Sequence, residues 1–274
     1  MIDTHVHFWH YEPVKDAWIT DHMMAIKRDF TPAQLEVQLK ANGVDGCVAV
    51  QADQSENETK FLLAYAEQFP FIKGVVGWVD LRDRNLAERL AHFAVHHQLK
   101  GWRHIAQAEP DGFLASEDFL RGIAMLKQHA YTYDILIHKG QLKDAITLAE
   151  KFPDQKFILN HLAKPDIAAK KEDMEWYEGI KLLAQQKNVY CKVSGMVTEA
   201  NWLHWKYNDM VFYLDAVFEH FGFDRVMFGS DWPVCTLAAT YTEVKHILNQ
   251  YTLGLEKEQQ NKIFETNAIR CYNL

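Results

Sequence analysis

Short apolar runs of strand length alternate with longer amphipathic stretches along almost the whole sequence. Strands that alternate with helices form βαβ units, in which neighbouring strands run parallel. About eight such units follow one another, which is the number that closes a (β/α)8 barrel. We therefore predict an α/β fold, a TIM-like (β/α)8 barrel that allows for distortion. Strands are predicted at residues 1–7, 46–51, 72–81, 101–105, 133–138, 156–161, 189–194 and 225–231, and helices at 32–43, 57–69, 85–98, 117–130, 142–152, 173–186, 208–221, 242–251 and 257–269.

A doubly wound open sheet is the main alternative to the barrel. Such sheets usually carry a phosphate-binding loop after the first strand, and neither a Gly-x-Gly-x-x-Gly nor a Walker-type sequence follows residues 1–7. The length of 274 residues suits one large barrel, and no repeat, low-complexity tract or linker interrupts the sequence. We therefore expect a single barrel domain over residues 1–274.

Composition narrows the classes of partner. The net charge of −8 provides no basic surface for nucleic acid or anionic membranes, so neither is expected as a partner. The sequence shows no secretory signal and no apolar run of membrane-spanning length. Its four cysteines are scattered, which favours free thiols in a reducing, cytoplasmic compartment. No feature of the sequence indicates an oligomeric state.

Polar residues gather at the carboxyl ends of the predicted strands, where the active site of such a barrel lies. In the first strand, His5 and His7 alternate with apolar residues, so both should project from one face, about 7 Å apart. Scattered surface histidines would not follow strand ends in this way, so we expect these residues to share one pocket. The other strand ends contribute Trp78, Asp80, Arg103, His104, His138, His161 and Asp231.

These residue types permit two kinds of chemistry. Neutral imidazoles and a carboxylate are suitable ligands for Zn²⁺ or a similar divalent ion, and His5, His7, His161 and Asp231 form the candidate set. The same groups can work without a metal, with Asp231 as the general base and with Arg103 and His161 stabilising an oxyanion. Residue types alone leave both modes open.

Simpler interpretations apply to some of these residues. His138 is equally compatible with a core position, and Lys164, which precedes a proline, with a cation on a surface loop. Trp78 and Trp232 suit packing as well as stacking on a sugar ring. Histidines within predicted helices are expected to be structural or solvated; these are His92, His96, His97, His129, His220 and His246.

Five motifs, in order and context, resemble the amidohydrolase-2 branch of the amidohydrolase superfamily, and most of all its sugar-lactonase group of L-fuconolactonases and L-rhamnonolactonases. A pyrone-dicarboxylate lactonase is a more distant relative. The resemblance spans nearly the whole chain and includes its ending, Thr266-Asn267-Ala268-Ile269-Arg270-Cys271-Tyr272. The motifs are Asp3-Thr4-His5-Val6-His7, Gly101-Trp102-Arg103-His104, Asn160-His161-Leu162-Ala163-Lys164-Pro165, Lys192-Val193-Ser194-Gly195 and Phe228-Gly229-Ser230-Asp231-Trp232-Pro233.

The resemblance implies a distorted barrel that hydrolyses the cyclic ester of a small sugar lactone. It places His5, His7, His161 and Asp231 in the site and Arg103 near the substrate. Binuclear relatives carry a bridging lysine at the fourth strand, where this chain has arginine and histidine, so the resemblance allows one Zn²⁺ or similar ion without requiring it. The residues expected to bind substrate are His104, Trp78, Trp232, Arg28 and His138.

One departure from the family pattern is Asn160, where many relatives carry aspartate. We expect this change to alter a neighbouring hydrogen bond rather than the chemistry. Two segments rich in aromatic residues, 9–30 and 197–208, are candidates for determining which lactone binds.

The mechanism that the strand ends suggest is attack on the lactone carbonyl by water that Asp231 activates, with His161 and Arg103 stabilising the oxyanion. A metal-dependent decarboxylase or amide hydrolase on the same barrel is the nearest alternative. A catalytically silent barrel that binds a sugar acid is an alternative of a different class.

Overall fold

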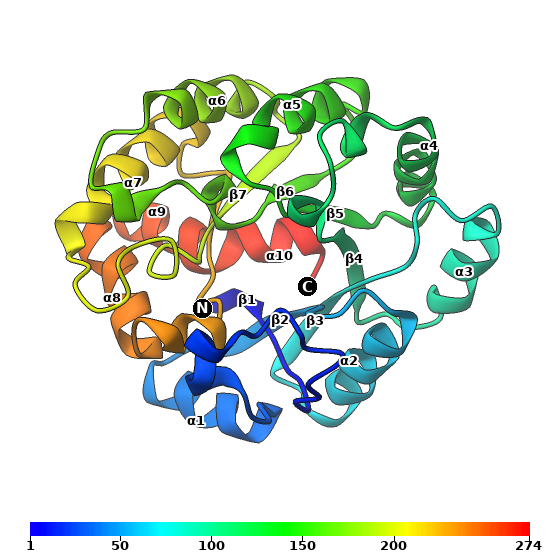
Figure 1. Cartoon of the computed structure of the whole chain (residues 1–274), viewed down its shortest axis with the longest axis horizontal. Coiled ribbons are helices and arrows are strands. Elements are labelled where there is room, and N and C mark those ends of the chain that lie inside the picture. Colours follow the sequence, from blue (N-terminus) through cyan, green and yellow to red (C-terminus); the bar gives the residue numbers. More distant parts are fainter.

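Eight parallel strands form the centre of the computed structural model, which describes residues 1–274 (Figure 1). Each strand pairs with the next one in the sequence, from β1 to β8. The ring closes between the residues that follow β8 and the end of β1, where the His7 N–H donates to the Trp232 carbonyl at 2.7 Å. The predicted (β/α)8 barrel is therefore confirmed. The strands are β1 (Ile2–Val6), β2 (Gly46–Val50), β3 (Ile72–Gly77), β4 (Leu99–His104), β5 (Thr132–Ile135), β6 (Phe157–Leu159), β7 (Val189–Val193) and β8 (Val226–Phe228).

Helices surround the strands, as Figure 1 shows. Several begin where the sequence provides a cap: the Ser55 hydroxyl accepts from the Glu58 N–H at 3.2 Å, and Thr240 and Glu243 form a capping box. The helices are α1 (Pro32–Ala41), α2 (Glu56–Gln68), α3 (Leu86–Phe93), α4 (Glu117–Leu126), α5 (Leu142–Lys151), α6 (Met174–Ala184), α7 (Tyr207–Phe221), α8 (Tyr241–Tyr251), α9 (Lys257–Asn261) and α10 (Asn267–Tyr272). None of them is long and apolar enough to span a membrane.

Several elements are shorter than predicted. The helices expected at 85–98 and 117–130 end at Phe93 and Leu126, and the helix expected at 257–269 is divided into α9 and α10 by a π-helical turn. Strands β3, β5, β6 and β8 also end early. Consequently His161 and Asp231 lie in the loops beyond their strands, both with left-handed backbone, at φ 53° and 60°.

A β-bulge in β1 determines which of its residues face the barrel interior. The pairing with β2 moves from Asp3–Cys47 to Val6–Ala49, so β1 contains one more residue than its partner over this stretch. In a regular strand, residues an odd number apart, such as Ile2 and His5, would point to opposite faces. The extra residue reverses this alternation, and Ile2 packs with apolar side chains inside the barrel. Ile2 and His5 therefore share the inner face.

Helix α10 lies across the amino-terminal end of the barrel and packs into it (Figure 1). Its residues Ala268, Cys271 and Tyr272 are buried against apolar side chains from the strands. Helix α10 therefore closes the amino-terminal end of the barrel, and a functional pocket can form only at the carboxyl ends of the strands. The strand residues in this cluster are Ile2, Val48, Val50, Val76, Ile158, Tyr190 and Met227.

A buried ion pair lies between this apolar layer and the pocket. The Lys192 ammonium donates to the Asp134 carboxylate at 2.7 Å, and both side chains are completely buried. Asp134 also accepts from the Tyr272 hydroxyl of α10 at 2.9 Å and from the Asn160 amide at 2.9 Å. The carboxylate therefore has three donors, which is how a buried charge is normally compensated.

Loss of one partner of this ion pair should destabilise the barrel strongly. In Lys192→Met, the Asp134 carboxylate remains buried without its cation, and we expect the free energy of unfolding to fall by about 3–5 kcal/mol. The double variant with Asp134→Leu should lose less, because no uncompensated charge remains. Urea unfolding measures both. Lys127→Met, which breaks the exposed pair with Asp154, is the control and should change stability by less than about 1 kcal/mol; an equal loss in the control would contradict the prediction.

Candidate active site

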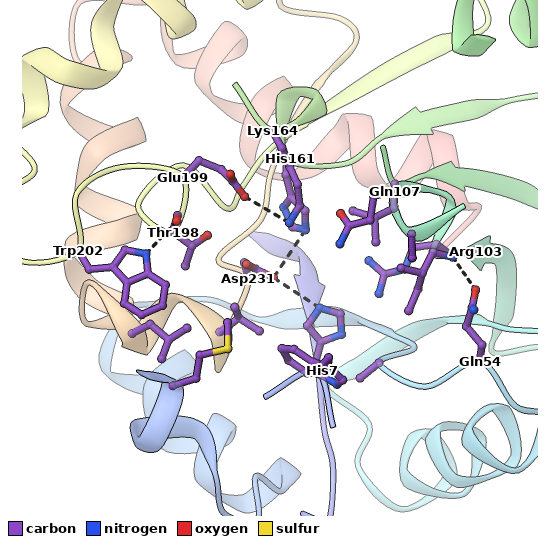
Figure 2. A pocket seen from close by; sticks show the side chains of 18 residues that line it. His7, Gln54, Arg103, Gln107, His161, Lys164, Thr198, Glu199, Trp202 and Asp231 are labelled. Carbon is purple, nitrogen blue, oxygen red and sulfur yellow. Dashed lines mark hydrogen bonds and ion pairs between the residues drawn. The ribbon is translucent and has the colours of Figure 1, made fainter. Parts of the chain in front are cut away.

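A cavity of about 510 Å³ opens at the carboxyl ends of the strands. Figure 2 shows His7, Arg103, His161 and Asp231 pointing toward one another in this cavity. They come from the loop after β1, from the end of β4, and from the loops after β6 and β8. His5 lies directly beneath, with its Nε2 atom 3.1 Å from the Nε2 atom of His7. Four of the residues predicted at strand ends therefore meet in one cavity, whereas Trp78, Asp80, His104 and His138 are not part of its lining.

Hydrogen bonds fix the orientation of His7. Its Nδ1 atom lies 2.7 Å from the Val50 carbonyl oxygen, which can only accept, so Nδ1 carries the proton and Nε2 has the free lone pair. That Nε2 atom lies 3.5 Å from Oδ1 of Asp231. Asp231 is also held by its backbone, because its N–H donates to the His5 carbonyl at 2.9 Å. The His7 lone pair consequently faces both His5 and Asp231.

His161 is positioned by the segment after β7. Its Nδ1 atom lies 2.8 Å from the Ser194 hydroxyl, and its Nε2 atom lies 3.8 Å from Asp231 Oδ1. Gly195 packs against the imidazole so closely that a Cβ atom would come within 2.6 Å of His161 Nδ1. Gly195 also has a φ of 65°, which favours glycine. Ser194-Gly195 therefore provides both the hydrogen bond and the space that the imidazole needs.

Arg103 forms the wall of the site next to the histidines. Its Nη1 atom lies 3.3 Å from His5 Nε2 and 3.3 Å from the Asn160 amide oxygen. Its Nη2 atom donates to the carbonyl oxygen of Gln51. Nε is buried and has no hydrogen-bond partner in the protein. Arg103 nevertheless lines the cavity, so its guanidinium is a cationic group beside any molecule that binds there.

Burial and nearby charges set the protonation of the cluster. Burial lowers the pKa of His161 to about 3 and the pKa of His5 well below its usual range, so both imidazoles are neutral at neutral pH. Burial alone would raise the pKa of Asp231, but His161 and His7 outweigh it and the pKa is lowered. Burial also lowers the pKa of Arg103, to about 10, which leaves its charge intact. The site thus combines neutral imidazoles, a carboxylate and a guanidinium.

This donor set fits a divalent cation. The ligand atoms of His5, His161 and Asp231 lie within 4.8 Å of one another, and all three residues are buried. Two neutral imidazoles and one carboxylate are ligands that Zn²⁺ accepts. The 3.1 Å separation of the His5 and His7 Nε2 atoms adds to the fit. In the absence of a cation, a proton on His5 Nε2 satisfies the same contact, because the Lys192 ammonium lies 3.4 Å from His5 Nδ1 and can only donate to it.

The five residues expected to bind substrate are outside the cavity lining. Arg28 is exposed and stacks on Phe30, and Trp232 is buried against Phe8 and Phe30. His138 is exposed in the turn after β5, because that strand ends at Ile135. Trp78 donates to His104 Nδ1 at 3.2 Å, and His104 Nε2 lies 2.8 Å from Glu109. Their role as substrate contacts stays a prediction.

Other residues that line the cavity were not predicted as site residues. Two segments singled out for their aromatics do reach it: Trp18 and Met23 from the first, and Thr198, Glu199 and Trp202 from the second. Their aromatic content was the available signal, but loops without periodicity do not indicate which side chain points inward. Lys164, three residues after His161, lines the cavity rather than being only a cation on a surface loop. The remaining polar residues of the lining are Gln54 and Gln107.

Comparison with known proteins identifies the family. The model of the amidohydrolase family matches residues 2–274. This chain belongs to the amidohydrolase family. Among curated amidohydrolase relatives, the L-fucono-1,5-lactonase of Burkholderia multivorans is 37% identical, with 100% of this chain and 96% of that protein covered. The L-fucono-1,5-lactonase of Burkholderia ambifaria is 33% identical, with 88% and 82% covered. The family resemblance of the motifs is therefore confirmed.

Solved structures of amidohydrolases agree with the computed fold. A crystal structure of an amidohydrolase from Burkholderia multivorans with bound zinc superimposes with a TM-score of 0.96. That protein is 37% identical to this chain, and the match covers 100% of this chain and 99% of the other. The expectation that the site is compatible with a divalent metal is confirmed by this neighbour together with the cluster of His5, His161 and Asp231.

The buried histidines should make stability depend on pH. His161 has a lower pKa in the folded than in the unfolded chain, so the unfolded chain binds the additional proton below pH 6.5. In chelator-treated protein we expect the free energy of unfolding to decrease as the pH falls from 6.5, by about 1 kcal/mol per pH unit for this histidine. Urea unfolding at several pH values measures the slope. His161→Gln should reduce it and exposed His97→Gln should not; an unchanged slope in His161→Gln would refute the assignment.

Proposed function

We propose that this chain is a lactonase that opens the cyclic ester of a sugar aldonolactone of the L-fuconolactone or L-rhamnonolactone type. The observation that carries the proposal is the convergence of the Asp231 carboxylate, the Arg103 guanidinium and His161 in one cavity. Ester hydrolysis needs a base for water and positive donors for the oxyanion, and these groups supply both. The full-length likeness to curated L-fucono-1,5-lactonases supports the same reaction.

The first step is attack by water on the lactone carbonyl carbon. Asp231 is ionised at neutral pH and takes a proton from the water as the new C–O bond forms. The negative charge that develops on the carbonyl oxygen is stabilised by Arg103, whose charged guanidinium lines the cavity. His161 adds a second donor at Nε2 when its Nδ1 atom accepts a hydrogen bond from Ser194.

The second step breaks the ester. The oxyanion collapses, the bond between the carbonyl carbon and the ring oxygen breaks, and the proton held by Asp231 passes to that oxygen. The product is a sugar acid with a free hydroxyl group, and Asp231 returns to its ionised form. Water supplies every atom that the product gains, so no oxidant or other reactant is needed.

A divalent metal fits the same cluster, held by His5, His161 and Asp231 with His7 beside them. When bound, such an ion polarises a carbonyl oxygen or lowers the pKa of water. The residues that hold it overlap with the proposed general base. The protein groups alone nevertheless provide a complete route for ester hydrolysis.

Replacement of the general base tests the reaction assignment. Asp231→Asn should lower kcat/KM for L-fuconolactone by about 10²–10⁴-fold, because the amide cannot accept the proton from water. A pH-indicator assay measures the rate, and circular dichroism verifies the fold. Asp80→Asn is a matched control, since Asp80 follows β3 but pairs with Arg82 outside the cavity. Wild-type rates in folded Asp231→Asn would refute the role of Asp231.

Removal of metal tests whether the protein groups suffice. After chelation we expect at least about a tenth of the lactonase activity to remain, because Asp231, Arg103 and His161 provide the acid–base and oxyanion groups. The assay should use a panel of aldonolactones, with bound zinc measured by elemental analysis. Stoichiometric zinc, complete loss on chelation and no turnover of any lactone would instead favour a metal-dependent amide hydrolase or decarboxylase.

A further inference from the structure

The turn after β6 has an unusual backbone. Four consecutive residues, His161, Leu162, Ala163 and Lys164, have left-handed φ values of 53°, 53°, 57° and 50°. None is glycine, and for other residues this conformation costs about 1–2 kcal/mol each and normally occurs singly. A run of four persists only where the surroundings enforce it, and such strain concentrates at functional sites.

Hydrogen bonds and burial hold this turn in its conformation. The Lys164 N–H donates to the His161 carbonyl at 2.7 Å, and the Trp176 indole donates to the Leu162 carbonyl at 2.6 Å. Leu162 and Ala163 are completely buried. The consequence is that His161 and Lys164, three residues apart, both line the cavity (Figure 2). An extended loop would send them in different directions.

Lys164 meets a carboxylate in the cavity. Its Nζ atom lies 3.3 Å from Oε1 of Glu199, and the two side chains keep 20% and 24% of their surface exposed. A partly exposed ion pair contributes little to stability, so it does not repay the strain of the turn. Trp202, three residues after Glu199, presents its ring to the same cavity (Figure 2). A cation, a carboxylate and an aromatic ring together are suited to binding a hydroxylated ring.

We infer that Lys164 and Glu199 are specificity residues that bind two neighbouring hydroxyl groups of the lactone ring. Lys164 donates to one hydroxyl oxygen and Glu199 accepts from the other hydroxyl, while Trp202 packs against the ring. The Lys164 Nζ and Glu199 Oε1 atoms lie 3.3 Å apart, so one ring can contact both through neighbouring hydroxyl groups. The inference rests on the proposed lactonase function and extends it by naming the groups that distinguish a polyhydroxylated lactone from an unsubstituted one.

The test compares two six-membered lactones. L-fucono-1,5-lactone carries hydroxyl groups on its ring, and δ-valerolactone has no ring substituents. Lys164→Met and Glu199→Gln should each lower kcat/KM for the sugar lactone by about 10–100-fold, the effect of losing a hydrogen bond to a charged group. For δ-valerolactone we expect a change of less than about threefold. Lys170→Met is the matched control, because Lys170 also has a left-handed backbone and an acidic partner, Asp209, but lies outside the cavity.

The outcomes separate the inference from the proposed function. Equal losses on both lactones would mean that Lys164 acts only by holding the turn and His161, which overturns the inference while the lactonase function stands. Unchanged rates on the sugar lactone would also overturn it. If Lys164→Met does not fold, Glu199→Gln decides the question, because Glu199 lies outside the strained turn. If the unmodified protein opens neither lactone, both the proposed function and the inference fail.

Discussion

The buried ion pair of Lys192 and Asp134 supports the residues beneath the cavity. Two charges inside a barrel are tolerated only when each finds partners, and here those partners belong to different parts of the fold. Tyr272 approaches Asp134 from helix α10 below, and Asn160 from the end of β6 beside it. Asn160 in turn accepts from Arg103. Helix α10 and the arginine that lines the cavity are thus linked through Asn160 and the Asp134 carboxylate.

This arrangement gives a physical reason for the departure at Asn160. Its amide nitrogen donates to Asp134 while its amide oxygen accepts from Arg103, so one side chain satisfies an anion and a cation. An ionised aspartate could accept from Arg103 but would place a second negative charge next to Asp134. That the change alters a hydrogen bond rather than the chemistry stays a prediction. Asn160 acts through Arg103 and Asp134 rather than at the cavity itself.

The sequence predicted which residues lie near the carboxyl ends of the strands, but it did not predict where the side chains in the following loops point. Parallel strands in a closed ring bring their carboxyl ends together, so His7, His161, Arg103 and Asp231 had to meet once the barrel was predicted. His138 shows the limit: its strand ends three residues earlier, and the turn that follows exposes it. Lysine in a strand as apolar as 189–193 was an overlooked signal, because a buried charge requires a buried partner.

His7 is held in one tautomer, whereas His161 can adopt either tautomer, and this difference affects the chemistry of the site. The Val50 carbonyl can only accept, so it holds His7 in one tautomer with its lone pair toward Asp231. Ser194 can donate or accept, so it leaves His161 free to present either an N–H or a lone pair at Nε2. An oxyanion requires an N–H at this atom, and a metal cation requires a lone pair. His161 is therefore the residue at which the same pocket can serve metal-free ester hydrolysis or metal binding.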